Sequence, residues 1–104
     1  MAISVVVRTN YSNHDLARWV GGESVNHICD IGRSDRSRFP LLYGVDPYGN
    51  TWFNCLQMEQ MIEELNAVRE VSDDSEVAEA ITELLLLAEI VCEKPHRSMR
   101  FLGD

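Results

Sequence analysis

The sequence predicts one α+β domain, in which an antiparallel sheet of three to four strands packs on a two-helix hairpin in the order β-β-(β)-α-α-β. Two observations lead to this prediction. Short β-branched segments of alternating polarity come first in the chain, and two longer segments with apolar residues at helical spacing follow them. A chain of 104 residues without repeats or low-complexity stretches fits one core, so we place no domain boundary within residues 1–104.

The first strand is expected over residues 2–8, where β-branched residues alternate with polar ones. Residues 24–31 alternate in the same way, and we expect them to form a hairpin with the first strand around residues 10–23. The intervening segment 14–20 fits either a short strand or a helical turn, which Gly21-Gly22 ends.

Shorter features are expected in the middle and at the end of the chain. A structureless loop over residues 32–50 would be unusual in so small a domain, so we expect a short strand at 39–43. The residues Asp46-Pro47-Tyr48-Gly49 suit a type I turn. A short extended segment is expected over 51–53, and residues 98–102 are expected to form a closing strand.

Two helices have clearer signals at both ends. Asn54 is suited to cap the first helix, and Gln57 completes a capping-box pattern. The second helix begins after Ser72-Asp73-Asp74-Ser75, and Pro95 ends it by Lys94. The core-facing residues are expected to be Met58, Met61, Ile62, Leu65 and Val68 in the first helix, and Val77, Ile81, Leu84, Leu85, Ala88 and Cys92 in the second.

The second helix carries a further apolar stripe, formed by Leu86, Leu87 and Ile90. Two interpretations of this stripe are open. Either strands cover the helix on two sides, or the stripe is the seam of a homodimer.

The net charge of −8 is unevenly distributed. Residues 1–55 contain five acids and five arginines, whereas residues 56–93 contain eleven acids and only Arg69 as a base. This balance excludes a nucleic-acid binder that relies on overall positive charge, and we expect no direct nucleic-acid partner. The acidic segment is interpreted either as a solvated helix face or as a surface for a basic partner.

Compartment is predicted from missing features. The longest aliphatic run, Leu84–Ala88, is too short to span a membrane, and residues 1–10 do not resemble a secretion signal. Cys29, Cys55 and Cys92 are odd in number and widely spaced, which argues against a disulfide framework. We therefore expect a cytoplasmic protein that does not bind membranes.

The sequence offers little support for metal or cofactor chemistry. His27 and Cys29 alternate on one predicted strand face, but no second ligand pair accompanies them, so a buried cysteine is the favoured interpretation and no metal is predicted. No phosphate-binding glycine motif is present, and no cofactor is predicted. The loop with Arg33, Arg36 and Arg38 either grips phosphate or RNA, or pairs with the protein's own acids.

A longer motif leads from the turn into the first helix. Residues 41–58 read LLYGVDPYGNTWFNCLQM, and the chain ends with PHRSMRFLGD. In both places the sequence resembles a group of small uncharacterised proteins found mainly in actinobacteria, with the patterns L-L-x-G-[IV]-D-P-Y-G-[DN]-T-x-F-N-x-L-Q-M and P-H-x-x-x-x-F-[IL]-G-D. The resemblance implies a bacterial, intracellular, single-domain protein and identifies no catalytic residue.

Three functional hypotheses are open. The first is a protein-binding module of immunity or inhibitor type, which engages a basic partner through acidic residues of the helices. The second is a small enzyme or ligand-binding domain with a pocket around residues 43–54 and the C-terminus, and the third is the homodimer. The acids of the first hypothesis are Glu59, Glu63, Glu64, Glu70, Asp73, Asp74, Glu76, Glu79 and Glu83, and the pocket residues of the second are Asp46, Tyr48, Trp52, Asn54, His96 and Asp104.

Overall fold

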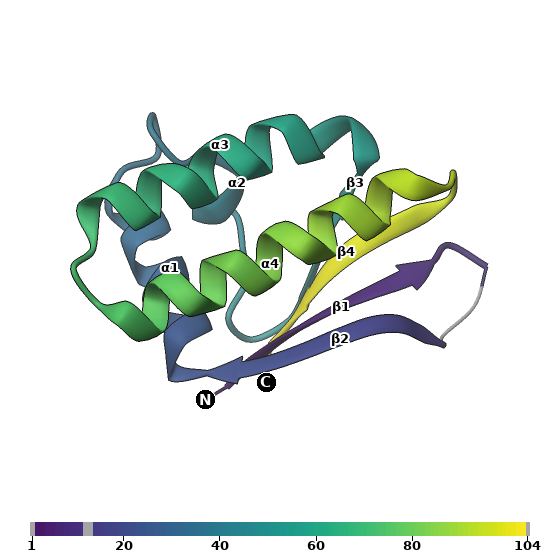
Figure 1. Ribbon diagram of the computed structural model, residues 1–104, viewed down its shortest axis with the longest axis horizontal. Coiled ribbons are helices and arrows are strands. Elements are labelled where there is room, and N and C mark those ends of the chain that lie inside the picture. Colours follow the sequence, from purple (N-terminus) through teal and green to yellow (C-terminus); the bar gives the residue numbers. More distant parts are fainter. Residues whose placement is uncertain (1, 12–13, 104) are drawn as a thin grey trace.

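The computed structural model describes residues 2–11 and 14–103 and has a mixed α+β fold. Helices α3 and α4 lie side by side over one face of an antiparallel sheet, with α1 and α2 beside them (Figure 1). The elements, in chain order, are β1 (Ile3–Thr9), β2 (Asp15–Gly22), α1 (Glu23–Ser34), α2 (Pro40–Tyr43), β3 (Asn50–Asn54), α3 (Cys55–Val71), α4 (Ser75–Glu93) and β4 (Arg97–Leu102).

The four described strands are arranged in the order β2-β1-β4-β3, and every neighbouring pair is antiparallel. The central pair joins the two ends of the chain, because Val5 lies opposite Phe101. Side chains on the helix side of this pair, such as Val5, Val7, Met99 and Phe101, are fully buried against the helices. The predicted antiparallel sheet and its packing on two long helices are confirmed.

The predicted strand at 24–31 is wrong, because these residues belong to α1. The strand that pairs with β1 is β2, which covers most of the segment for which a strand and a helical turn were both open. The buried residues of α1 are Val25, Ile28, Cys29 and Gly32, a spacing that follows a helix rather than a strand. Val25 and Cys29 fit both the strand pattern and the helix pattern, whereas Ile28 and Gly32 face the core only in the helix.

The predicted short strand at 39–43 is also wrong, because a single helical turn, α2, occupies this place. Proline at the first helical position suits this start. The carboxylate of Glu64 on α3 accepts hydrogen bonds from the backbone N–H groups of Leu41 (3.0 Å) and Leu42 (2.9 Å). A buried carboxylate therefore caps α2 from a distant part of the chain.

Glu64 was expected on the solvated acidic surface, and this expectation is wrong. Its side chain is 1% exposed, and Gln60 Nε2 donates a further hydrogen bond of 2.8 Å to it. An ionised carboxylate is stable in such a place only when several donors replace water. Glu64 is thus part of the interior and is inaccessible to a partner.

The two long helices and the closing strand agree with the predictions. Asn54 and Gln57 form the predicted capping box of α3, in which the Asn54 N–H donates to Gln57 Oε1 at 2.9 Å. The turn before β3 also forms, since the Gly49 N–H donates to the Asp46 carbonyl. Helix α4 ends at Glu93, two residues before Pro95.

The cysteines differ from expectation, because Cys55 and Cys92 form a disulfide. The bond joins the first residue of α3 to the last turn of α4, with the two Cα atoms 5.1 Å apart. Spacing in the sequence could not reveal this pair, because the antiparallel helix hairpin is what brings the two ends together. Cys29 remains free and buried, and burial raises the pKa of its thiol to about 12.

The second apolar stripe of α4 is divided between interior and surface. Leu87 is buried in the core and Ile90 packs partly against it, whereas Leu86 is half exposed. With one member in the core, the stripe does not form a continuous exposed seam. None of the helices in the described part of the chain is long and apolar enough to cross a membrane.

The face of the sheet away from the helices carries arginines. Arg18, Val6, Arg100 and Trp52 lie in register across the four strands. Arg100 is 3% exposed and its guanidinium carbon lies 3.7 Å from the centroid of the Trp52 ring. Long arginine side chains can cover apolar surface in this way, and Val6 between them is fully buried.

Candidate functional site: an acidic groove beside Trp19

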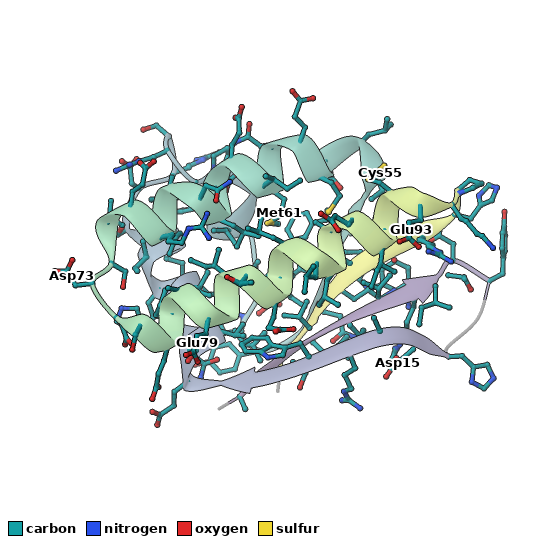
Figure 2. All side chains as sticks on the ribbon, viewed as in Figure 1. Asp15, Cys55, Met61, Asp73, Glu79 and Glu93 are labelled. Atoms are coloured by element: carbon teal, nitrogen blue, oxygen red, sulfur yellow. A yellow bond between two sulfur atoms is a disulfide. The ribbon has the colours of Figure 1, made fainter. Side chains whose placement is uncertain are left out.

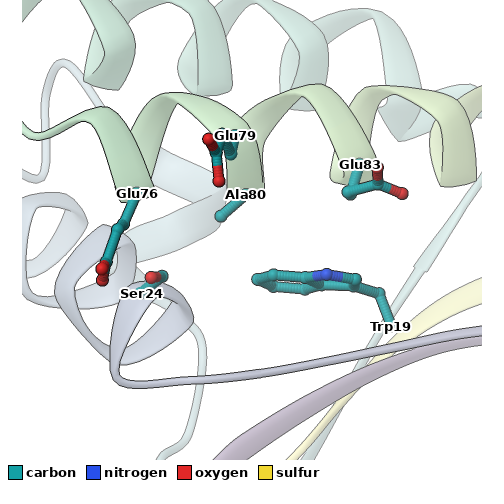
Figure 3. A pocket seen from close by; sticks show the side chains of 6 residues that line it. All are labelled: Trp19, Ser24, Glu76, Glu79, Ala80 and Glu83. Atoms are coloured by element: carbon teal, nitrogen blue, oxygen red, sulfur yellow. The ribbon is translucent and has the colours of Figure 1, made fainter.

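The larger concave site is a groove between the first half of α4 and the junction of β2 with α1. It encloses about 620 Å³. Figure 3 shows the Trp19 indole facing α4, with Glu76, Glu79 and Glu83 extending from that helix and Ser24 at the start of α1. Ala80 completes the lining, so the groove combines one aromatic surface with three carboxylates.

The backbone at the end of β2 holds the indole in place. Trp19 lies opposite Val5 in the strand register and so points toward the helices. Its ring occupies the space beside Gly21, where an added Cβ would lie 1.9 Å from the ring and 2.5 Å from Val25 Cγ2. Gly21 is therefore required for this position of the indole, since any side chain there would displace the ring.

The carboxylates share one side of α4 because of their spacing. Glu76, Glu79 and Glu83 follow one another at intervals of three and four residues, which places them on one helix face. Asp74 caps the helix by accepting a hydrogen bond of 2.8 Å from the Glu76 N–H. The positive end of the helix dipole lies in the same turn, where acidic residues are favourably placed.

None of the three groove glutamates forms an ion pair with another residue in the described ranges. The ion pairs lie elsewhere: Asp15 pairs with Arg8 and Arg18, and Arg97 pairs with Glu93. Three carboxylates on one helix face repel one another, and a cation placed between them relieves the repulsion. An indole beside them adds a surface on which an organic cation is attracted.

The nine predicted partner-binding acids do not form one surface. Glu76, Glu79 and Glu83 line the groove, whereas Glu64 is buried. The remaining acids are exposed outside the groove lining, on α3 or in the α3–α4 loop, where Figure 2 labels Asp73; they are Glu59, Glu63, Glu70, Asp73 and Asp74. Sequence reasoning missed Trp19 and Ser24, and the pair Gly21-Gly22, which lies between them in the chain, is the signal that points to them.

The residues of the pocket predicted under the second hypothesis lie in several parts of the fold. Asp46 and Tyr48 belong to the turn that precedes β3, where Asp46 Oδ1 accepts the Tyr48 N–H at 2.9 Å. Asn54 lies at the other end of β3, which places it roughly 13 Å from the strand's first residue at ~3.3 Å per residue. Asp104 lies outside the described residues.

His96 serves a turn rather than the predicted pocket. Its φ angle of 65° is in the left-handed region, and its carbonyl accepts a 2.7 Å hydrogen bond from the Asn10 N–H. The imidazole lies beside Tyr11, with ring centroids 5.2 Å apart. This places His96 at the connection from α4 to β4.

Two of the predicted pocket residues do meet at a smaller concave site of about 260 Å³. Trp52 and Asn54 line it from β3, and the remaining lining residues are Asn10, Phe53, Gln57 and Ser98. Arg100 lies next to this site, since its Nε donates to Ser98 Oγ at 3.0 Å and its guanidinium packs on Trp52. The lining offers amide, hydroxyl and indole groups and contains no carboxylate, imidazole or thiol.

The arginine loop makes contacts within the protein. Arg33 pairs with Asp30, while Arg36 and Arg38 lie over the rings of Tyr43 (5.7 Å) and Phe39 (5.5 Å). Asp35 accepts hydrogen bonds from Ser37 and from the Arg38 N–H, and these lower its pKa. The loop is therefore organised by its own side chains.

The described residues contain no group of three or more histidine, cysteine or acidic side chains suited to hold a metal ion. No family model matches the chain, and neither a curated protein nor a solved structure shows significant similarity to it.

Proposed function

We propose that this protein is a binding module of immunity or inhibitor type, and that its acidic groove receives a cationic side chain of a basic protein partner. The observation that carries the proposal is the arrangement of Trp19 opposite three glutamates that form no ion pair with the residues the structure describes. A guanidinium or ammonium group inserted there contacts an aromatic ring on one side and carboxylates on the other. The excess of acids in the second half of the chain adds longer-range attraction for a basic partner.

A direct test compares two pairs of glutamates that have the same spacing. Glu79→Gln/Glu83→Gln changes the groove, and Glu59→Gln/Glu63→Gln changes the exposed face of α3 by the same two charges. With an oligoarginine peptide as the probe, calorimetric titration at low salt is expected to show about tenfold weaker binding for the groove variant, which corresponds to ~1.4 kcal/mol. Equal losses in the two variants would show that only net charge matters and would refute the groove.

The natural partner is tested through the product of the neighbouring gene. If that product is basic, co-expression is expected to yield a complex that dissociates as salt is raised, because complementary surface charges are screened. Trp19→Leu should weaken the complex while leaving the helices folded, as judged by circular dichroism. A complex whose affinity changes neither with salt concentration nor with Trp19→Leu contradicts this mode of binding.

The smaller site beside Trp52 supports the alternative of a ligand-binding domain. Its amide and hydroxyl groups suit a small neutral or anionic molecule with several hydrogen-bonding groups. The lining consists of amide, hydroxyl and aromatic side chains, so it favours binding over acid–base catalysis. Screening a metabolite library by thermal shift tests this alternative, with Trp52→Leu as the variant that should abolish any stabilisation.

A further inference from the structure

The Cys55–Cys92 bond lies at the end of the helix pair opposite the α3–α4 loop (Figure 2). Both residues are exposed, and Leu56 beside Cys55 is 92% exposed. About 13 Å of helix separates Cys92 from Glu83 at ~1.5 Å per residue, so the sulfur pair is distinct from the acidic groove. Both cysteine residues are therefore at the protein surface.

The two sulfurs differ in their electrostatic surroundings. Cys55 is the first residue of α3, whose first turn contains no acid, so unpaired N–H groups and the helix dipole stabilise a thiolate there. Cys92 lies in the last turn of α4 beside Glu93, where carbonyl groups and a carboxylate disfavour a second negative charge. In the reduced protein, Cys55 is therefore the better nucleophile.

We propose that Cys55 and Cys92 form a thiol–disulfide exchange site for low-molecular-weight peptidic disulfides, in which Cys55 attacks and Cys92 resolves. The Cys55 thiolate bonds to one sulfur of the disulfide RSSR, whose S–S bond breaks to release one thiolate RS⁻. Cys92, having lost its proton to solvent, then attacks the Cys55 sulfur and releases the second RS⁻, which leaves the Cys55–Cys92 bond. The protein dithiol is oxidised by two electrons, and one disulfide is reduced to two thiols.

The surroundings of Cys55 suit a peptidic disulfide. Asn54 and Gln57, from the same turn, line the smaller concave site together with Trp52. Their side-chain oxygens are engaged in the capping box, and their NH₂ groups can donate to the carboxylate and carbonyl groups of a short peptide, while Leu56 offers an apolar contact. This proposal is independent of partner binding at the acidic groove, because no residue is shared between the two sites.

The experiment follows the reaction of the reduced protein with oxidised glutathione by mass spectrometry after acid quenching. Wild-type protein is expected to form the internal disulfide and release two glutathione molecules. Cys92→Ser should accumulate a single glutathione adduct on Cys55, and Cys55→Ser should react about threefold more slowly or less, because the thiolate at the start of α3 is favoured while its intrinsic nucleophilicity falls with its basicity. Cys29 should remain unmodified in each native protein, since it is buried.

A second measurement guards against variants that fail to fold. Reduced wild-type protein is alkylated with iodoacetamide across a pH series, and each cysteine is quantified by peptide mapping. Cys55 is expected to react at lower pH than Cys92. Equal pH profiles for the two cysteines, or adduct formation that requires denaturant, would overturn the proposal.

Discussion

Charged residues are used differently on the two sides of this molecule. On the outer face of the sheet, the arginines are engaged by the protein itself: Arg8 and Arg18 pair with Asp15, and Arg100 donates to the Thr9 carbonyl at 3.1 Å. In the groove, Glu76, Glu79 and Glu83 have no such ion-pair partners in the described ranges. Charges that organise the fold are thus paired, and charges left unpaired in a concave site are available for binding.

Glu64 differs from the other acids of the described helices because its side chain is buried. Its replacement is expected to have the largest effect on stability. Glu64→Ala leaves two backbone N–H groups of α2 without an acceptor and should lower the free energy of unfolding by about 3–5 kcal/mol. The exposed neighbour Glu63→Ala should change it by less than ~0.5 kcal/mol. Urea unfolding measures both, and similar losses would show that burial does not separate these two acids.

Arg100 tests whether the outer face uses charge or packing. Arg100→Ala removes the side chain that lies on Trp52 and should cost about 2–3 kcal/mol of stability. Arg100→Met keeps most of the volume and should cost under ~1 kcal/mol, because burial and the nearby Arg8 already lower the pKa of this guanidinium. A methionine variant as unstable as the alanine variant would mean that the cation itself is essential.

The ion pair between Asp15 and Arg8 is tested through the pH dependence of stability. The hydrogen bond from Arg8 is the main cause that lowers the pKa of Asp15 below 3.8. A carboxyl group with a depressed folded pKa stabilises the protein above its ordinary value, and this contribution is lost as the pH falls through the folded value. In Asp15→Asn, the free energy of unfolding should therefore decrease less than in the wild type as the pH falls below about 4. The difference should be under ~1 kcal/mol, because the pair is partly exposed. Urea unfolding at one pH above about 4 and one pH below it measures the effect. Asp73→Asn, in the α3–α4 loop, is the matched control and should leave the pH dependence of stability unchanged.

The smallest expected effect comes from the groove acids. Glu79 has like-charged neighbours three residues before and four residues after it, so Glu79→Gln should raise stability by ~0.3–0.5 kcal/mol at low salt. Salt should reduce the gain, since it screens the repulsion. Glu59→Gln relieves one such neighbour, Glu63, and should give a smaller gain. Destabilisation by Glu79→Gln would show that the groove acids are paired in solution.

Local sequence signals were sufficient to predict secondary structure where the apolar residues followed either the strand period or the helix period alone. The capping residues Asn54 and Gln57 placed the start of α3, and β-branched alternation placed β1. Local signals were insufficient at α1, where Val25 and Cys29 fit both a strand and a helix. They were also insufficient at α2, whose backbone N–H groups are capped by a carboxylate 23 residues from Leu41. For the site, the sequence indicated Glu76, Glu79 and Glu83 but not the indole that faces them.

The sequence alone determined an α+β fold, the two long helices and the excess of acid in the second half of the chain. Those features depend on residue types and on spacings within one element, which are local properties. Only the tertiary structure decided which acids are buried, which cysteines are bonded and which aromatic ring meets the glutamates. Each of these depends on residues distant in the chain, and packing of the helices on the sheet is what brings those residues together.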